Sequence, residues 1–213
     1  MRTQNKIVGI IGRKGTGKSS ALREILQHTP RFVLWDAMAE HAWCTRIPSI
    51  DALYGFLTLA CDSGTAMARY VPQDDLEDDF GEVCEAVYET GRIALAVEEV
   101  PFLVSPSTVP GAFDRIIRTG RHKGIDVFWT AQRAAEVARR LTAATDLFFL
   151  FSQTEPRDLD ALAERIGSES AREVAGLPRH GFLIWDVLDH CAISPEVAAR
   201  KISEPFNVNS GRL

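Results

Sequence analysis

Eight residues near the start of the chain, Gly12 to Ser19, have the types and spacing of a phosphate-binding loop. Their sequence, GRKGTGKS, fits the P-loop or Walker A pattern G-x-x-x-x-G-K-[ST]. Glycines let the backbone curl so that successive N–H groups point at phosphate oxygens, and the helix that follows adds its own N–H groups and dipole. Lys18 would reach the β- and γ-phosphates, and the Ser19 hydroxyl would ligate Mg²⁺. We therefore expect nucleotide to bind at Gly12, Arg13, Lys14, Gly15, Thr16, Gly17, Lys18, Ser19 and Ser20.

Two adjacent carboxylates, Glu98 and Glu99, could hold the metal ion and activate water. They follow the apolar run Arg92–Val97 (RIALAV), which is typical of a central parallel strand covered on both faces. In P-loop proteins this is the Walker B position, where the first acid holds Mg²⁺, usually through water, and the second polarises the attacking water. Aspartate is usual at the first position, so the division of labour between the two acids stays open. The alternative is an ordinary strand end that reaches solvent.

A glutamine and two arginines complete the candidate catalytic set. Gln132 follows the expected strand Ile125–Thr130, where it could orient water or sense the γ-phosphate, unless it is an idle loop residue. Arg121 and Arg118 lie on an expected helix, Ala112–His122, as candidates for an arginine finger offered to a neighbouring subunit's γ-phosphate. A solvated basic helix face is the other interpretation of these arginines.

The expected elements place these residues on one parallel sheet. Ile7–Ile11 is predicted to be a buried strand directly before the loop and Ser20–Gln27 a helix directly after it, the context that the motif requires. Further strands are expected at Arg31–Trp35, Ala66–Val71, Arg92–Val97, Ile125–Thr130, Asp146–Phe151 and Gly181–Val187, and helices at Asp74–Thr90, Ala112–His122, Ala134–Ala144, Pro156–Ile166 and Arg172–Leu177. Within the less readable residues 37–64, Ile50–Ala60 fits either helix or strand. The alternation predicts an α/β fold with a mainly parallel sheet flanked by helices.

The composition is that of a globular protein and excludes several classes. The 213 residues suit one P-loop domain, which we expect over 1–190, followed by a loosely ordered tail over 191–213. No apolar run approaches the roughly 20 residues that span a bilayer, and the first residues leave no room for a signal peptide, so we expect a cytoplasmic protein without a transmembrane segment.

The net charge of −5 argues against a globally basic nucleic-acid binder, although a local basic patch stays possible. The widely spaced cysteines are interpreted as free buried thiols rather than a zinc site or a disulfide framework: Cys44, Cys61, Cys84 and Cys191.

Three segments together resemble the FtsK–HerA superfamily of ring-forming motor ATPases. They are GRKGTGKS, the Glu-Glu strand end, and GRHKGIDVFWTAQR, whose glycine, hydrophobic strand and terminal Thr-Ala-Gln-Arg are the most telling. The resemblance covers roughly residues 5–190 and implies an additional-strand (RecA-like) P-loop fold, in which the strand Ile125–Thr130 lies between the P-loop strand and the Walker B strand. It also implies that Gln132 is the sensor and that Arg121 is the best finger candidate, with Arg118 next.

Within that superfamily, this small chain resembles the genome-packaging ATPases of tailless, membrane-containing icosahedral viruses. That resemblance implies a homo-oligomeric ring that uses ATP and Mg²⁺ to translocate double-stranded DNA, with capsid or vertex proteins as further partners, in host cytoplasm or in the virion. The zonula occludens toxin-like assembly proteins of filamentous phages are the closest rival, although they usually carry a transmembrane helix. A nucleotide kinase is a third interpretation, but the basic, acceptor-binding residues that a kinase would need after the second strand are missing.

Overall fold

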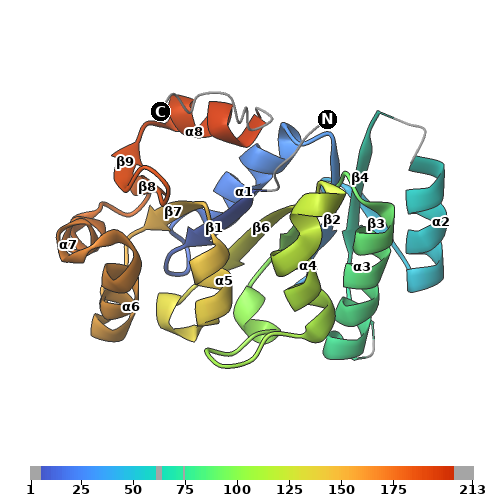
Figure 1. Cartoon of the computed structure of the whole chain (residues 1–213), viewed down its shortest axis with the longest axis horizontal. Coiled ribbons are helices and arrows are strands. Elements are labelled where there is room, and N and C mark those ends of the chain that lie inside the picture. The colour runs from blue at the N-terminus through green and yellow to red at the C-terminus, as the bar shows by residue number, and fades with distance from the viewer. Residues whose placement is uncertain (1–5, 61–63, 74, 204–213) are drawn as a thin grey trace.

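The computed structural model describes residues 6–60, 64–73 and 75–203, and within these residues nine strands form one sheet (Figure 1). The strand order is β3-β4-β2-β5-β6-β1-β7-β8-β9. The strands β3 to β7 in that order are mutually parallel, whereas β8 and β9 are antiparallel to their neighbours. The strand bounds are β1 Ile7–Ile11, β2 Arg31–Trp35, β3 Thr45–Ile47, β4 Ala66–Tyr70, β5 Ala94–Val97, β6 Asp126–Ala131, β7 Leu147–Phe151, β8 Phe182–Asp186 and β9 Cys191–Ile193.

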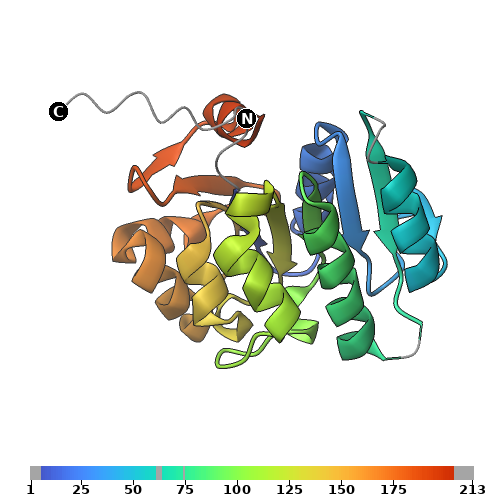
Figure 2. The same cartoon turned by 45° about the vertical axis from the view of Figure 1, so that its right-hand side comes forward.

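Eight α-helices and two short 3₁₀ helices connect the strands within the described residues, and they cover the sheet on both faces (Figure 2). Apolar residues of the helices from α2 to α7 share one core cluster with one face of the sheet, and apolar residues of α1 and α8 share a second cluster with the other face. The helix bounds are α1 Lys18–Gln27, α2 Ile50–Ala60, α3 Leu76–Thr90, η1 Val100–Phe102, α4 Gly111–Lys123, η2 Ala134–Glu136, α5 Arg139–Ala144, α6 Pro156–Ile166, α7 Ser168–Gly176 and α8 Pro195–Ser203.

The position of β6 confirms the predicted additional-strand fold. It pairs in parallel with β1 on one side and with β5 on the other. In this register Ile11 lies opposite Ala131, and Val97 lies opposite Trp129. The carboxyl ends of the three strands therefore meet at one edge, which brings the P-loop, the two glutamates and Gln132 together.

Close packing between β1 and β6 explains a glycine in the middle of a buried strand. A Cβ atom on Gly9 would lie 2.4 Å from the ring of Trp129. That ring is fully buried, and its Nε1 donates to Thr145 Oγ1 at 3.2 Å. Since side chains in a close-packed core have little room to move, only glycine leaves space for Trp129 here.

Ile50–Ala60, whose sequence fits either helix or strand, is helical. Other local expectations differ from the structure, since the expected helix Ala134–Ala144 is divided into η2 and α5. The last helix before β8 begins earlier than expected, at Ser168. The helix expected over Asp74–Thr90 begins at Leu76, directly after the capping residue Asp75, and Leu76 is exposed in its first turn.

Residues 191–203, placed in a loosely ordered tail by the sequence analysis, form β9 and α8. β9 pairs with β8, and Ala198 of α8 is buried against the sheet. Lys201 Nζ also lies 2.6 Å from Asp186 Oδ2. These contacts with residues outside the segment hold it in place. Residues 204–213 and Cys61 lie outside the described residues. Cys44, Cys84 and Cys191 are free thiols, but only Cys84 is buried as predicted, since Cys44 is partly exposed and Cys191 is exposed.

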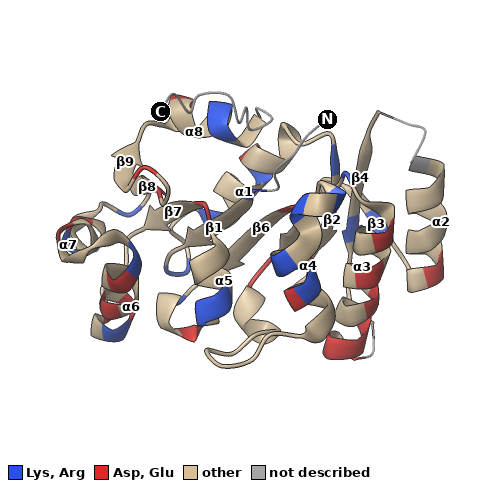
Figure 3. Cartoon of the chain, in the orientation of Figure 1, with Lys and Arg blue, Asp and Glu red and all other residues tan. Residues whose placement is uncertain are grey.

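Charge is distributed unevenly over the helices (Figure 3). Acidic residues occur along α3, and basic residues outnumber acidic ones on the neighbouring α4. An ion pair connects the two helices, in which Arg115 Nη1 lies 2.9 Å from Glu85 Oε2. None of the described helices is both long and apolar enough to cross a bilayer.

Candidate active site for nucleotide hydrolysis

The P-loop connects the carboxyl end of β1 to the first turn of α1, and its fold depends on glycine. A Cβ atom on Gly12 would lie 2.4 Å from Phe151 Cβ, and Gly17, which precedes α1, has a φ of +113°. Thr16 Oγ1 closes the turn by donating to the carbonyl of Arg13 at 2.8 Å. The predicted phosphate-binding residues therefore form one tight loop at the start of a helix, where N–H groups are free to bind an anion.

Lys18 is the first residue of α1, and its ammonium group faces the loop and the two glutamates. Its Nζ lies 3.4 Å from the carbonyl oxygen of Arg13 and 3.7 Å from Glu99 Oε1. Burial lowers the pKa of Lys18, while the charges of Glu99 and Glu98 oppose that change. A buried cation between a phosphate-sized loop and two acids is well placed to contact a polyphosphate.

Glu98 contacts the P-loop directly, through its serine. Ser19 Oγ donates to Glu98 Oε1 at 2.8 Å, although the two residues are 79 positions apart in the sequence. The Glu98 side chain is almost fully buried at the end of β5, and its backbone N–H donates to Trp35 of β2. A serine hydroxyl beside a carboxylate is a set of hard oxygen donors of the kind that Mg²⁺ prefers.

Glu99 points toward Gln132 and Lys18 instead. Its backbone is left-handed, with a φ of 49°, and its N–H donates to Thr130 Oγ1 at 2.9 Å. Burial raises the pKa of Glu99, and the charge of Lys18 and hydrogen bonds from Gln132 work against this rise. The structure thus separates the two acids, with Glu98 beside Ser19 and Glu99 beside Gln132.

Gln132 lies directly after β6, as the sequence predicted, and is held from behind by a second glutamine. Gln153 Nε2 donates to the carbonyl of Gln132 at 2.8 Å, and Gln153 itself is buried. The support of Gln153 was not predicted. It comes from the residues after β7, and nothing in the local sequence pattern around Gln153 indicates that it would reach the next loop.

A second set of residues that the sequence analysis missed lies behind Glu98. His41 Nε2 is 2.6 Å from Glu98 Oε2, and Trp43 Nε1 donates to His41 Nδ1 at 3.1 Å. Asp36, which directly follows β2, accepts hydrogen bonds from the backbone N–H groups of Glu40 and His41 and from Arg69. Burial opposes the charged form of His41, but the hydrogen bond and charge of Glu98 raise its pKa overall.

Arg118 and Arg121 lie away from this site. The helix that carries them, α4, precedes β6 and ends at Lys123, whose carbonyl accepts from Arg92 just before β5 begins. The arginines therefore approach the amino edge of the sheet, whereas the P-loop lies at the carboxyl edge. Arg118 is exposed, and its Nη1 lies 3.7 Å from Asp114. Neither arginine can serve the P-loop of its own chain in this arrangement.

A groove of about 1040 Å³ begins at the P-loop and runs between α1 and α8. Near the loop it is lined by Ser20, Phe151, His180 and Phe182. His180 Nδ1 lies 3.3 Å from the carbonyl oxygen of Thr16, which ties the segment before β8 to the P-loop. The rings of Phe151 and Phe182 are 5.3 Å apart. The groove thus offers an apolar, aromatic surface next to a phosphate-binding loop.

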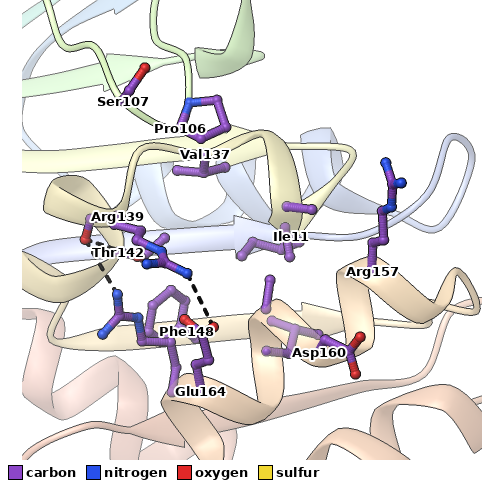
Figure 4. Close-up of a pocket in the computed structure, with 15 residues that line it drawn as sticks. Ile11, Pro106, Ser107, Val137, Arg139, Thr142, Phe148, Arg157, Asp160 and Glu164 are labelled. Carbon is purple, nitrogen blue, oxygen red and sulfur yellow. Dashed lines mark hydrogen bonds and ion pairs between the residues drawn. The ribbon is translucent and has the colours of Figure 1, made fainter.

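A second pocket, of about 480 Å³, lies on the opposite face between α5 and α6 (Figure 4). Two of the three arginines that line it contact neighbouring groups, because Arg139 pairs with Glu164 at 3.3 Å and Arg165 donates to the carbonyl of Arg139 at 3.4 Å.

No protein-family model and no curated protein matches the sequence. Among solved structures, the fold is similar to that of the genome packaging NTPase of Sulfolobus turreted icosahedral virus 2 in complex with ATP-gammaS. That structure has a TM-score of 0.74 and 22% identity, covering 89% of this chain and 95% of the other. The DNA-packaging ATPase from Sulfolobus turreted icosahedral virus is similar at a TM-score of 0.69 and 21% identity, covering 90% and 97% of the two chains. The N-terminal domain of zonular occludens toxin from Neisseria meningitidis matches at a TM-score of only 0.49 and 17% identity, covering 93% and 91%, and no argument rests on it.

Proposed function

We propose that this chain is an ATP hydrolase that forms a homo-oligomeric ring and translocates double-stranded DNA, packaging a viral genome into a capsid. The observation that carries the proposal is the convergence of Lys18, Ser19, Glu98, Glu99 and Gln132 at one edge of the sheet. The similarity in fold to two viral packaging ATPases supports it over nearly the whole chain. The protein would act in host cytoplasm or in the virion, with capsid or vertex proteins as partners.

The separation of the two acids suggests their roles. Ser19 and Glu98 would hold Mg²⁺, since their oxygens lie 2.8 Å apart and suit a hard cation. When bound, this ion would neutralise charge on the β- and γ-phosphate oxygens. Glu99, whose pKa is raised, would take a proton from the attacking water. At the same time the water oxygen would bond to the γ-phosphorus, and the bond from the γ-phosphorus to the β-phosphate oxygen would break. Gln132 would orient that water, and Lys18 would bind the phosphates.

The arginines fit a role between subunits. Because Arg121 and Arg118 approach the edge opposite the P-loop, either would have to act on a neighbouring subunit's γ-phosphate. Arg121→Ala should then lower ATPase activity only in the assembled state. If the assembled enzyme keeps its full activity, the assignment of Arg121 as the finger is wrong, and Arg118→Ala becomes the next variant to examine.

The proposed roles of the two acids imply where the nucleobase would lie. With the γ-phosphate beside Glu98 and Glu99, at the end of β5, the other end of the nucleotide would leave the loop on the far side of β1, toward β7 and β8. The groove lined by Ser20, His180 and Phe182 opens there, and its aromatic rings can stack on a base without reading its polar edge.

The experiment that tests the proposal is steady-state ATPase activity with and without duplex DNA, in low and in high salt. We expect stimulation by DNA that weakens steeply with salt, because binding to phosphates releases counterions. Lys18→Ala is the control and should abolish both basal and stimulated activity. Hydrolysis that does not respond to DNA would reject the DNA motor and favour an ATPase that acts on protein or membrane complexes, as in the toxin-like assembly proteins.

A further inference from the structure

We propose that His41 is a positioning residue for Glu98, holding one carboxylate oxygen so that the other faces Ser19 and the metal ion. His41 and Glu98 are both almost fully buried, and His41 Nε2 lies 2.6 Å from Glu98 Oε2. The second oxygen, Oε1, accepts from Ser19 Oγ at 2.8 Å. Each end of the carboxylate therefore has its own partner. The inference rests on the proposed Mg²⁺–ATP site.

Trp43 selects the tautomer of His41. An indole N–H can only donate, and Trp43 Nε1 lies 3.1 Å from His41 Nδ1. Nδ1 must therefore accept, which leaves the proton on Nε2, where it is donated to Glu98. The two rings meet edge to face at 85°, with centroids 6.2 Å apart. Trp43 thus fixes both the orientation of the imidazole and the direction of its hydrogen bond.

The backbone of His41 is held as firmly as its ring. Asp36, at the end of β2, accepts from the N–H of His41 at 3.0 Å and from the N–H of Glu40 at 2.9 Å. Arg69 of β4 lies 2.8 Å from the same carboxylate. The loop after β2 is therefore attached to the sheet at its start, and its imidazole reaches across to the end of β5.

This arrangement accounts for glutamate at a position where aspartate is usual. Glutamate has one more methylene group and one more torsion than aspartate, so an unsupported Glu98 would sample several positions. With Oε2 bound to His41, that freedom is removed and Oε1 stays beside Ser19. Partners of this kind behind a metal ligand commonly change metal affinity by about 10- to 100-fold.

A metal ion bound directly by Asp36, His41 and Glu98 is the competing interpretation, since their ligand atoms lie within 4.8 Å of one another. The partners of Asp36 argue against it. Its two oxygens already accept from two backbone N–H groups and from the cationic Arg69, and a metal ion there would lie next to that positive charge. A hydrogen-bond network that orients Glu98 fits these contacts better.

The test compares His41→Gln with His41→Leu, two side chains of similar size of which only glutamine can donate to Glu98. Binding of a fluorescent ATP analogue is titrated with Mg²⁺ in the absence of DNA, and also measured without metal. We expect His41→Leu to need about 10- to 100-fold more Mg²⁺ for half-maximal binding, with unchanged affinity for the metal-free analogue. His41→Gln should restore most of the loss. The exposed His190, in the turn between β8 and β9, supplies the control His190→Asn, since asparagine tolerates the left-handed backbone at this position.

Equal Mg²⁺ midpoints for wild type, His41→Gln and His41→Leu would overturn the inference. If His41→Leu does not fold by circular dichroism, Trp43→Phe decides, because it removes the donor that fixes the tautomer and should raise the Mg²⁺ midpoint several-fold. An unchanged midpoint in Trp43→Phe would then reject the inference. These outcomes are independent of the proposed DNA motor, since a wild type without DNA stimulation can still show the Mg²⁺ dependence.

Discussion

Asp36 should be among the most sensitive positions for stability outside the P-loop. Its side chain is fully buried and accepts hydrogen bonds at 2.9, 3.0 and 2.8 Å from Glu40 N, His41 N and Arg69 Nη1. Asp36→Ala leaves the Arg69 guanidinium without its carboxylate, and Arg69 is itself only 13% exposed. Breaking a buried ion pair from one side costs about 3–5 kcal/mol, which is a large part of the roughly 5–15 kcal/mol that stabilises a domain.

The assay is urea unfolding followed by circular dichroism. We expect Asp36→Ala to lower the free energy of unfolding by about 4 kcal/mol, or the melting temperature by roughly 8–16 °C for a chain of this size. Asp160→Ala, at an exposed position of α6, is the matched control and should change stability by less than about 0.5 kcal/mol. The double variant Asp36→Ala, Arg69→Met removes the orphaned cation and should recover about 1–2 kcal/mol of the loss.

Two results would refute the reasoning. A loss below about 1 kcal/mol for Asp36→Ala would mean that water or another group replaces the carboxylate. Strict additivity of Asp36→Ala and Arg69→Met would mean that the two side chains are not energetically coupled, since contacting charged residues normally show a coupling of about 0.5–3 kcal/mol.

Three further predictions concern the nucleotide and the end of the described chain. Phe182→Ala should weaken binding of ATP several-fold but leave binding of inorganic tripolyphosphate unchanged, because only the base would reach the groove; equal losses for both ligands in a competition assay would place the base elsewhere. Glu99→Gln should keep ATP affinity within about threefold while lowering kcat by at least about 100-fold, measured by single-turnover hydrolysis; normal turnover would show that Glu99 does not activate water. Lys201→Met should destabilise the protein by about 1 kcal/mol at pH 7 and by less near pH 3. Burial raises the pKa of Asp186, but the hydrogen bond and charge of Lys201, together with the backbone N–H groups of Asp189 and Leu188, outweigh burial and leave the pKa below the ordinary value of 3.8. This contribution is therefore complete above about pH 3.8 and is lost as the pH falls through the lower folded-state pKa; a pH-independent effect of Lys201→Met in denaturant titrations would contradict it.

The sequence by itself determined the features that depend on neighbouring residues. The P-loop needs glycines, a lysine and a serine at fixed spacing between a strand and a helix, and all of these lie within Ile7–Gln27. The apolar run before Glu98 predicts a buried central strand in the same way. The place of β6 between β1 and β5 was predicted from resemblance, because strand order involves pairings that no local pattern encodes.

Only the tertiary structure decided how the two acids divide. Glu98 contacts Ser19 across 79 positions and His41 across 57, and hydrogen bonds of this range leave no periodicity or motif in the sequence. The same holds for the short segments β9 and α8, which resemble a tail in the sequence until the pairing with β8 and the ion pair to Asp186 are known. Local propensity is weak for such segments, since contacts made elsewhere in the chain determine whether they are ordered.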